Sequence, residues 1–318
     1  MLGGIMEVTV NKLAGSEVEI TGELAAGEFA AYRPEAIKQL NQANNVPGFR
    51  PGHASEAALV AQLGEEKILL EMAELAFQKF YPTLVTEKKL DVLGRPAITI
   101  TKLAKDNPLG FKIRTAIHPE FNLPDYRQLA KKANEKPLVA VTVEEKEVEE
   151  VLAELKKNPK FEAMPDLKDK VKADLLRSKG QKQKDKRRLE IIGAVVSQTT
   201  IDLPFILVEA ELNKMVAEIR AQTEQFGLKF DDYLKQIKKE EKDLRAEWRA
   251  DAERRVKTAL VLAKISEVEK IGAPEAEVET EVKHLKEHYK DAPDERLRTY
   301  VVNSLVNEAV FRFLEEQK

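Results

Sequence analysis

The stretch Pro47-Gly-Phe-Arg-Pro-Gly-His-Ala-Ser55 separates two helical patterns and contains the most informative residues of the chain. Gly48 and Gly52 permit left-handed backbone geometry, and the two prolines limit the freedom of the loop. This combination predicts a stiff tip that holds Phe49 and Arg50 outward. An aromatic side chain beside an arginine is typical of interface hot spots, and a stiff loop loses little entropy on binding. The alternative is a plain turn whose Phe49 packs into its own core.

The residues around this loop predict an α+β domain over residues 1–118. Apolar and polar residues alternate in short segments on both sides, which is the mark of half-buried strands. Helices are expected over 28–43 and in two segments after the loop, the first of which is capped by Ser55 and ended by Gly64. Strands, then helices, then strands predict helices packed on a small antiparallel sheet. The expected strands contain Val8 and Val10, Val18 and Ile20, Ala97–Thr101, and Gly110–His118.

The rest of the chain predicts a linker followed by an all-α domain. Residues 119–141 carry three prolines and are expected to be extended over a surface. Residues 142–318 read as helical, and Thr142 with Glu145 matches a capping box at the start of the first helix. No strict heptad runs through them, so an irregular bundle is expected. The later helices are expected over 166–199, 204–225, 230–271, 274–290 and 294–316.

Composition excludes several classes of function. The chain has 318 residues, of which 43% are hydrophobic and 34% charged, with a net charge of −3. A dedicated nucleic-acid binder usually carries a basic excess. There are no cysteines, so disulfides and thiolate sites are excluded. The start of the chain lacks an export pattern, and no stretch approaches the roughly 20 apolar residues of a membrane span. A cytoplasmic protein is expected.

Candidate catalytic and ligand-binding patterns are sparse. His284-Leu-Lys-Glu-His288 matches the H-x-x-E-H pattern of inverted zinc peptidases, but so short a pattern arises easily by chance in a charged helix. The basic run Lys168–Arg188 reads either as a patch for RNA or acidic clients or as a solvated helix face. No phosphate-cradling glycine loop and no G-x-S-x-G elbow occurs. No catalytic residue, metal or cofactor is therefore expected.

The loop 47–55 resembles the Gly-Phe-Arg-x-Gly-x-x-Pro loop of the trigger factor family, which are bacterial ribosome-associated chaperones. The order of strands and helices around it is similar to the ribosome-binding domain of that family. The segments Asp91–Ala97, His118–Pro124 and Ile201–Leu212 also resemble family joints, so the likeness covers nearly the whole chain. The resemblance implies a helical domain whose arms form a cradle. It also implies a ribosome-binding site made of Gly48, Phe49, Arg50, Pro51, Gly52 and His53.

Two departures from the family pattern stand out. The family commonly carries an FKBP-like prolyl isomerase domain on the connection between its other domains, whereas here that connection is only Asn158–Pro165. The isomerase domain is therefore expected to be absent. In the loop, Pro51 replaces a frequently basic residue and Ser55 replaces the last proline. Weaker ribosome docking than usual is expected from these changes.

The function implied by the resemblance is an ATP-independent chaperone for nascent or unfolded polypeptides. Its implied partners are a large-subunit ribosomal protein at the tunnel exit, nearby rRNA, its clients and a second copy of itself. A client surface needs adaptable apolar side chains, although ordinary core is the alternative for each one. The candidates are Met215, Phe226, Phe230, Tyr233, Tyr289 and Tyr300. The rival functions are a ribosome-independent holdase or assembly chaperone, a prolyl isomerase or zinc peptidase, and an adaptor for one partner.

Overall fold

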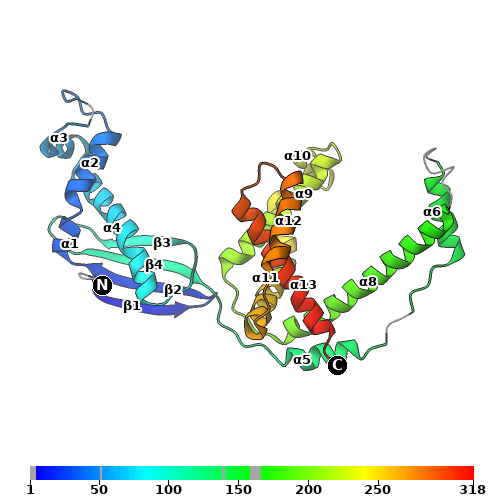
Figure 1. Ribbon diagram of the computed structural model, residues 1–318. Coiled ribbons are helices and arrows are strands. Elements are labelled where there is room, and N and C mark those ends of the chain that lie inside the picture. The colour runs from blue at the N-terminus through cyan, green and yellow to red at the C-terminus, as the bar shows by residue number, and fades with distance from the viewer. Residues whose placement is uncertain (1–4, 51, 138–139, 158–165) are drawn as a thin grey trace. The chain divides into compact units, whose positions relative to one another are not determined.

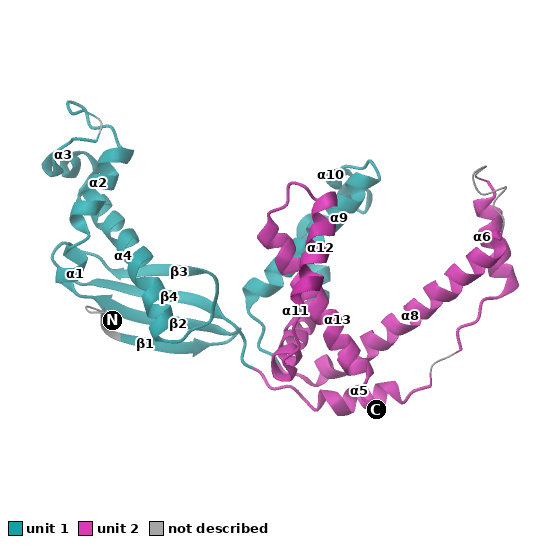
Figure 2. Ribbon diagram, in the orientation of Figure 1, with its two compact units in different colours: residues 1–120, 201–253 teal, residues 121–200, 254–318 magenta. Residues whose placement is uncertain are grey.

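The computed structural model describes residues 5–50, 52–137, 140–157 and 166–318. The chain divides into two compact units (Figure 2). Unit 1 contains residues 1–120 and 201–253, and unit 2 contains residues 121–200 and 254–318. Figure 1 gives the element labels. Because unit 1 takes in a segment from the helical half, its composition depends on contacts between residues far apart in the sequence.

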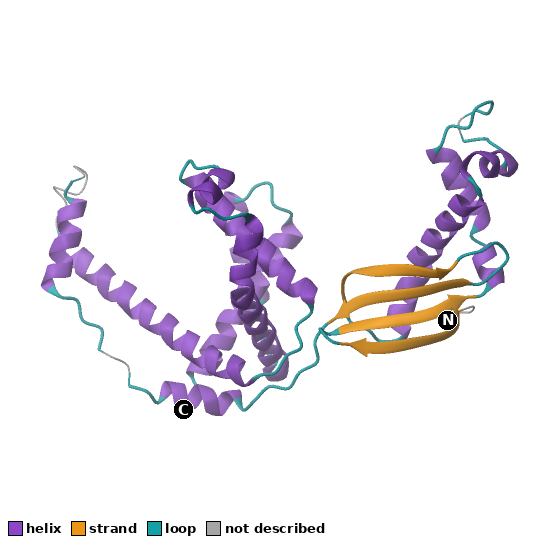
Figure 3. Cartoon of the chain, turned by 180° about the vertical axis from the view of Figure 1, so that it is seen from behind, coloured by secondary structure: helices purple, strands orange, loops and turns teal. Residues whose placement is uncertain are grey.

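Unit 1 begins with a four-stranded antiparallel sheet (Figure 3). The strands are ordered β1-β2-β4-β3, and paired residues such as Val10 with Ile20 and Ile20 with Ile113 set the register. Burial along β2 alternates strictly, as the alternating sequence predicts. The strands are β1 (Ile5–Leu13), β2 (Glu17–Leu24), β3 (Val92–Lys102) and β4 (Leu109–Ile117).

The long helix α4 (Glu65–Glu87) covers one face of this sheet (Figure 1). Its Phe77 and Phe80 pack against Phe111 of β4, with ring centroids 5.8 and 5.0 Å from that of Phe111. Ile20 and Ile113 are fully buried in the same cluster. The sheet face and the apolar stripe of α4 thus form one continuous core.

Three shorter helices complete this part of unit 1. They are α1 (Ala26–Ala30), α2 (Arg33–Ala43) and α3 (Glu56–Leu63). The single helix expected over 28–43 is wrong, because Pro34 stands in the first turn of α2, where a proline starts a new helix. Ser55 caps α3 through a bond from Ala58 N at 3.3 Å, and Gly64 ends it with φ +82°, both as predicted.

The remaining elements of unit 1 are α9 (Phe205–Gln225), α10 (Phe230–Gln236) and the first part of α11 (Glu241–Glu269). The expected helix over 230–271 is interrupted between α10 and α11, because Lys238 adopts a left-handed φ of +54°. Val208, Leu212 and Met215 of α9 pack against Ala252 of α11.

Unit 2 is helical in its described residues. It contains α5 (Tyr126–Asn134), α6 (Glu145–Leu155), α8 (Leu167–Gln198), the end of α11, α12 (Glu275–His288) and α13 (Asp294–Glu315). The expected capping box is shifted along the chain, since Glu144 and Glu147 form it. The expected connection Asn158–Pro165 lies outside the described residues.

Helix α5 lies inside the segment 119–141 that was expected to be extended. Asp125 caps it by accepting a hydrogen bond from Gln128 N at 3.0 Å. Asn134 donates to the carbonyl oxygens of Leu314 and Gln317, both at 2.9 Å, and so ties α5 to the end of α13. These contacts with distant residues stabilise the helix. The expectation of an extended segment was wrong, because the three prolines lie on either side of α5 and not within it. A small sheet with helices followed by a helical region confirms the predicted fold class, whereas the predicted domain boundaries stay a prediction.

Candidate functional site

The loop between α2 and α3 is anchored by a buried asparagine. Asn41 donates to Ala54 O at 2.9 Å and accepts from Ala54 N at 3.0 Å. Val46 and Ala54, at the two feet of the loop, pack with Leu59 of α3 in a small apolar cluster. Both ends of the loop are therefore held in place, and only its tip is free to contact a partner.

The tip exposes the residues that the sequence singles out. Phe49 is 42% exposed, and Arg50 and His53 are exposed as well. Gly48 and Gly52 have φ of +85° and +82°, which is the left-handed geometry that glycine tolerates best. Pro51 lies outside the described residues. The alternative in which Phe49 is packed into its own core is wrong, because Phe49 is among the exposed large hydrophobic residues and belongs to none of the buried clusters described.

An arginine ties together the helices that carry this loop. Arg33 of α2 donates to Glu56 at 2.7 Å and forms a two-pronged pair with Glu65 at 2.5 and 2.9 Å. The hydrogen bond from Arg33 holds the pKa of Glu65 below its usual range, and the same bond raises the pKa of Arg33. The loop lies at the end of these helices that is distant from the sheet (Figure 1). It is thus a braced, exposed tip.

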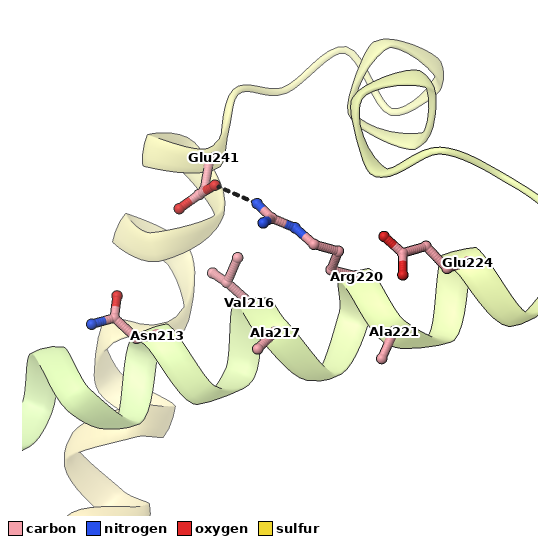
Figure 4. Close-up of a pocket in the computed structure, with 7 residues that line it drawn as sticks. All are labelled: Asn213, Val216, Ala217, Arg220, Ala221, Glu224 and Glu241. Atoms are coloured by element: carbon pink, nitrogen blue, oxygen red, sulfur yellow. Dashed lines mark hydrogen bonds and ion pairs between the residues drawn. The ribbon is translucent and has the colours of Figure 1, made fainter. Parts of the chain in front are cut away.

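A second candidate surface lies beside α9. Figure 4 shows a hollow whose wall includes the small apolar side chains of Val216, Ala217 and Ala221. Arg220 crosses it toward Glu241 at 3.5 Å and also lies over the Phe230 ring, 4.8 Å from the ring centroid. A neighbouring hollow shares Arg220 and Glu224 and extends along residues 227–231. Both hollows mix apolar and charged side chains in their walls, unlike the mostly apolar clefts that enclose small ligands.

Two protein-family models match this chain, and each of them covers about half of it. The description "Bacterial trigger factor protein (TF)" matches residues 6–155, and "Bacterial trigger factor protein (TF) C-terminus" matches residues 163–318. The chain belongs to the trigger factor family. The two matches almost touch, so this trigger factor lacks the middle domain.

Curated relatives agree with this assignment. The trigger factor of Caldicellulosiruptor bescii is 22% identical over 388 aligned positions, which cover 89% of each chain. That of Mycobacteroides abscessus is 35% identical over 151 residues, which cover 48% of this chain and 30% of the relative. A solved structure described as "Promiscuous Substrate Recognition in Folding and Assembly Activities of the Trigger Factor Chaperone" has a TM-score of 0.58 at 15% identity. That likeness covers 98% of this chain and 100% of the other, and it shows the fold.

The candidate client residues of this trigger factor divide by exposure. Phe226, Tyr289 and Tyr300 are 83%, 60% and 66% exposed. Met215 and Phe230 are buried, so neither offers its side chain to a client in this conformation. Their place in the candidate set is corrected here, because the 3.6-residue stripe that drew attention to Met215 marks the face buried between helices. Tyr233 is half-buried and stacks on the Phe230 ring.

Two strongly exposed apolar residues were not predicted. Leu189 of α8 and Val268 of α11 are 70% and 54% exposed. Each lies in a long helix that also carries buried apolar residues, such as Ile191 and Ile265, so no local signal separates it from them. Asn41 was missed for a different reason. Its partner Ala54 lies 13 residues further along the chain, beyond the loop, so no pattern within the helix predicts the contact.

Two negative findings apply to the described ranges only. Within residues 5–50, 52–137, 140–157 and 166–318, no helix is long and apolar enough to cross a bilayer. In that same part of the chain, no group of three or more His, Asp or Glu side chains could hold a metal ion. His284 and His288 lie side by side on α12 with ring centroids 5.4 Å apart and their planes at 81°, an edge-to-face arrangement.

Proposed function

We propose that this trigger factor is an ATP-independent chaperone that docks near the ribosomal tunnel exit and holds nascent or unfolded polypeptides. Family membership supports the chaperone role, and the relative of known structure is itself called a chaperone. The observation that carries the docking proposal is the exposure of Phe49 and Arg50 on a loop whose feet are buried.

The docking contact combines two kinds of interaction. Arg50 supplies charge-assisted hydrogen bonds to carboxylate or phosphate groups, and Phe49 supplies apolar area. The loop residues Gly48, Phe49, Arg50, Pro51, Gly52 and His53 form the proposed ribosome site. A large-subunit protein at the tunnel exit is the proposed partner, with rRNA beside it, which places the protein in the cytoplasm.

The client surface is proposed to be spread over several helices. Phe226, Tyr289 and Tyr300 expose apolar rings among charged side chains, so they offer weak contacts that form and break without nucleotide hydrolysis. We infer that the chain has no isomerase activity of its own, since the middle domain is missing. A cradle formed by the helical arms remains part of this proposal.

Co-sedimentation with ribosomes tests the docking site. The double variant Phe49→Ala/Arg50→Ala is expected to bind at least about thirtyfold more weakly, because the loss of even one hot-spot residue costs about 2 kcal/mol or more. The matched control is Phe205→Ala/Arg249→Ala, which removes another exposed aromatic–arginine pair of unit 1, 5.6 Å apart. Equal ribosome binding by wild type and the loop variant would contradict the docking site.

A second candidate function is a holdase that works away from ribosomes. Pro51 and Ser55, the departures from the family loop, favour it. Suppression of aggregation of a denatured substrate without ATP, together with no ribosome binding by the wild-type chain, would select this alternative. If molar excess gives no suppression, both chaperone proposals fail.

A further inference from the structure

The start of the α9 segment is hydrogen-bonded to the end of the β1–β2 hairpin within unit 1. The backbone N–H groups of Gly15 and Ser16 both donate to Asp202 Oδ2, at 2.7 and 3.1 Å. Ser16 Oγ donates to the Asp202 carbonyl oxygen at 2.6 Å. Three hydrogen bonds therefore join residues that are far apart in the sequence.

The hairpin turn is shaped for this contact. Gly15 and Ser16 lie in the loop between the paired residues Leu13 and Glu17 and have φ of +74° and +47°, so both are left-handed. Consecutive N–H groups in a turn can form a concavity that receives an anion. Here the anion is the carboxylate of Asp202, which comes from the same chain.

A close apolar contact fixes the same segment on the other edge of the sheet. Gly94 of β3 has φ +69°, and a Cβ atom built there would lie 2.2 Å from Ile206 Cδ1. The Ile206 side chain thus occupies the space that any larger residue at position 94 would need. Ile201 and Pro204, which belong to the same segment, are buried. Residues 201–206 are held at two points, one polar and one apolar.

The segment 201–206 lies directly after one of the points where the chain crosses between the two compact units. The chain passes between the two compact units at residues 120/121, 200/201 and 253/254, the last of these within α11. The hairpin end secures unit 1 beside both crossings that are not helical. Lys12 pairs with Glu120 at 3.0 Å, and Asp202 is bonded as described.

We propose that Asp202 and the Gly15–Ser16 turn form a clasp that holds α9 to the sheet, and that opening the clasp lets α9 and its neighbours pivot away from the sheet. Asp202 is exposed, so water competes for its carboxylate, and when this polar contact opens, the apolar contact of Ile206 with Gly94 remains as the point about which the segment turns. The consequence for clients rests on the proposed function: the clasp sets the angle between the docking loop and the α9–α10 surface.

Hydrogen exchange of the Gly15 and Ser16 amides reads the clasp directly. In the wild type, both amides are expected to be protected, and Asp202→Ala should speed their exchange by about tenfold, because hydrogen bonds to charged groups are among the stronger ones. Amides of β2 should not change. The control Asp106→Asn removes a carboxylate from the β3–β4 turn of the same sheet and should leave Gly15 and Ser16 protected. Unprotected wild-type amides would overturn the proposal.

A distance measurement tests the pivot. The chain has no cysteine, so Thr99→Cys on β3 and Lys214→Cys on α9 can carry a single pair of fluorescent labels. Asp202→Ala should broaden the distance distribution, and Ser16→Gly should do so more weakly, since it removes one hydrogen bond while suiting the left-handed turn. Distributions identical to the wild type would refute the pivot. Neither ribosomes nor clients are present, so failure here is distinct from failure of the chaperone function.

Discussion

The sheet with α4 and the helices α9, α10 and the first part of α11 belong to the same unit but have cores of different thickness, that is, hydrophobic clusters of different size. The first has a continuous cluster that joins β2, β4, α1, α2 and α4. The second is held by two small clusters, one around Leu212 and one around Val216 and Phe230. A thick core keeps the helices that carry the docking loop rigid. A thin one leaves apolar side chains such as Phe226 exposed, which suits an adaptable surface.

The largest expected effect is in the thick core. Phe111→Ala removes a fully buried ring that contacts two other phenylalanines and should lower the free energy of unfolding by about 3–5 kcal/mol. Urea denaturation followed by peptide-level hydrogen exchange measures the sheet and the helices separately. Exchange in β2 and β4 should rise first.

The matched change in the thin core is Leu212→Ala. We expect a loss of about 2–3 kcal/mol, near the low end for leucine, because a small cluster relaxes more easily around the missing atoms. Fluorescence of Trp248, which packs beside this cluster, follows the transition. A loss as large as that of Phe111→Ala would contradict the contrast between the two cores.

Asn41→Ala tests whether the loop needs its anchor. The change leaves the N–H and C=O of Ala54 without their partners, which costs about 1–3 kcal/mol for buried groups. Exchange should increase over residues 46–54, and ribosome binding should weaken although Phe49 and Arg50 are intact. The control is Asn45→Ala, an exposed neighbour in the same loop. Unchanged binding by Asn41→Ala would mean that the tip binds without its brace.

These two regions also differ in how much of them the sequence could predict. The strands, the Ser55 cap and the Gly64 terminus follow from local patterns, and the structure confirms them. The break between α10 and α11 at Lys238 could not be predicted, because neither glycine nor proline stands beside this residue. Local rules work best where a residue's conformation is decided by its immediate neighbours.

Contacts between distant residues account for most of the remaining misses. Asn134 ties helix α5 to the end of α13, and the clasp joins Ser16 to Asp202, although the Asp125 cap of α5 is a local signal. The exposed tip residues Phe49 and Arg50 could be predicted because the loop chemistry is local. Met215 could not be placed correctly, since a helical stripe shows which face is apolar and not what covers it.

A salt-bridge network in unit 2 supplements helix packing with charge. Arg188 of α8 pairs with Glu308 and Glu315 of α13 at 2.8 and 2.7 Å, and its side chain is 17% exposed. Arg188→Met keeps an apolar stem near the Phe311 ring but removes the guanidinium from both carboxylates, of which Glu308 keeps Arg312 at 3.9 Å. We expect a loss of about 1–2 kcal/mol at pH 7, less than for a fully buried pair because the glutamates are partly exposed.

Low pH should remove the stability that Arg188 provides through its pairs with Glu308 and Glu315. The hydrogen bond from Arg188 lowers the pKa of Glu308, so the stabilisation is present above the unfolded value of about 4.3 and is lost as the pH falls through the lowered folded value. The difference in unfolding free energy between wild type and Arg188→Met should therefore shrink below about pH 4. A difference that stays constant from pH 7 to pH 3 would show that packing, not charge, holds these helices together.

The smallest effect on stability is expected at the most exposed ring. Phe226 is 83% exposed, so Phe226→Ser should change the free energy of unfolding by no more than about 0.5 kcal/mol. Its effect should appear in aggregation suppression instead, where a client loses an apolar contact. The neighbouring exposed change Gln222→Ser is the control and should leave suppression intact. If Phe226→Ser is as active as this control, the thin-cored helices owe their exposed rings to loose packing alone, and client binding must be sought at Tyr289 and Tyr300.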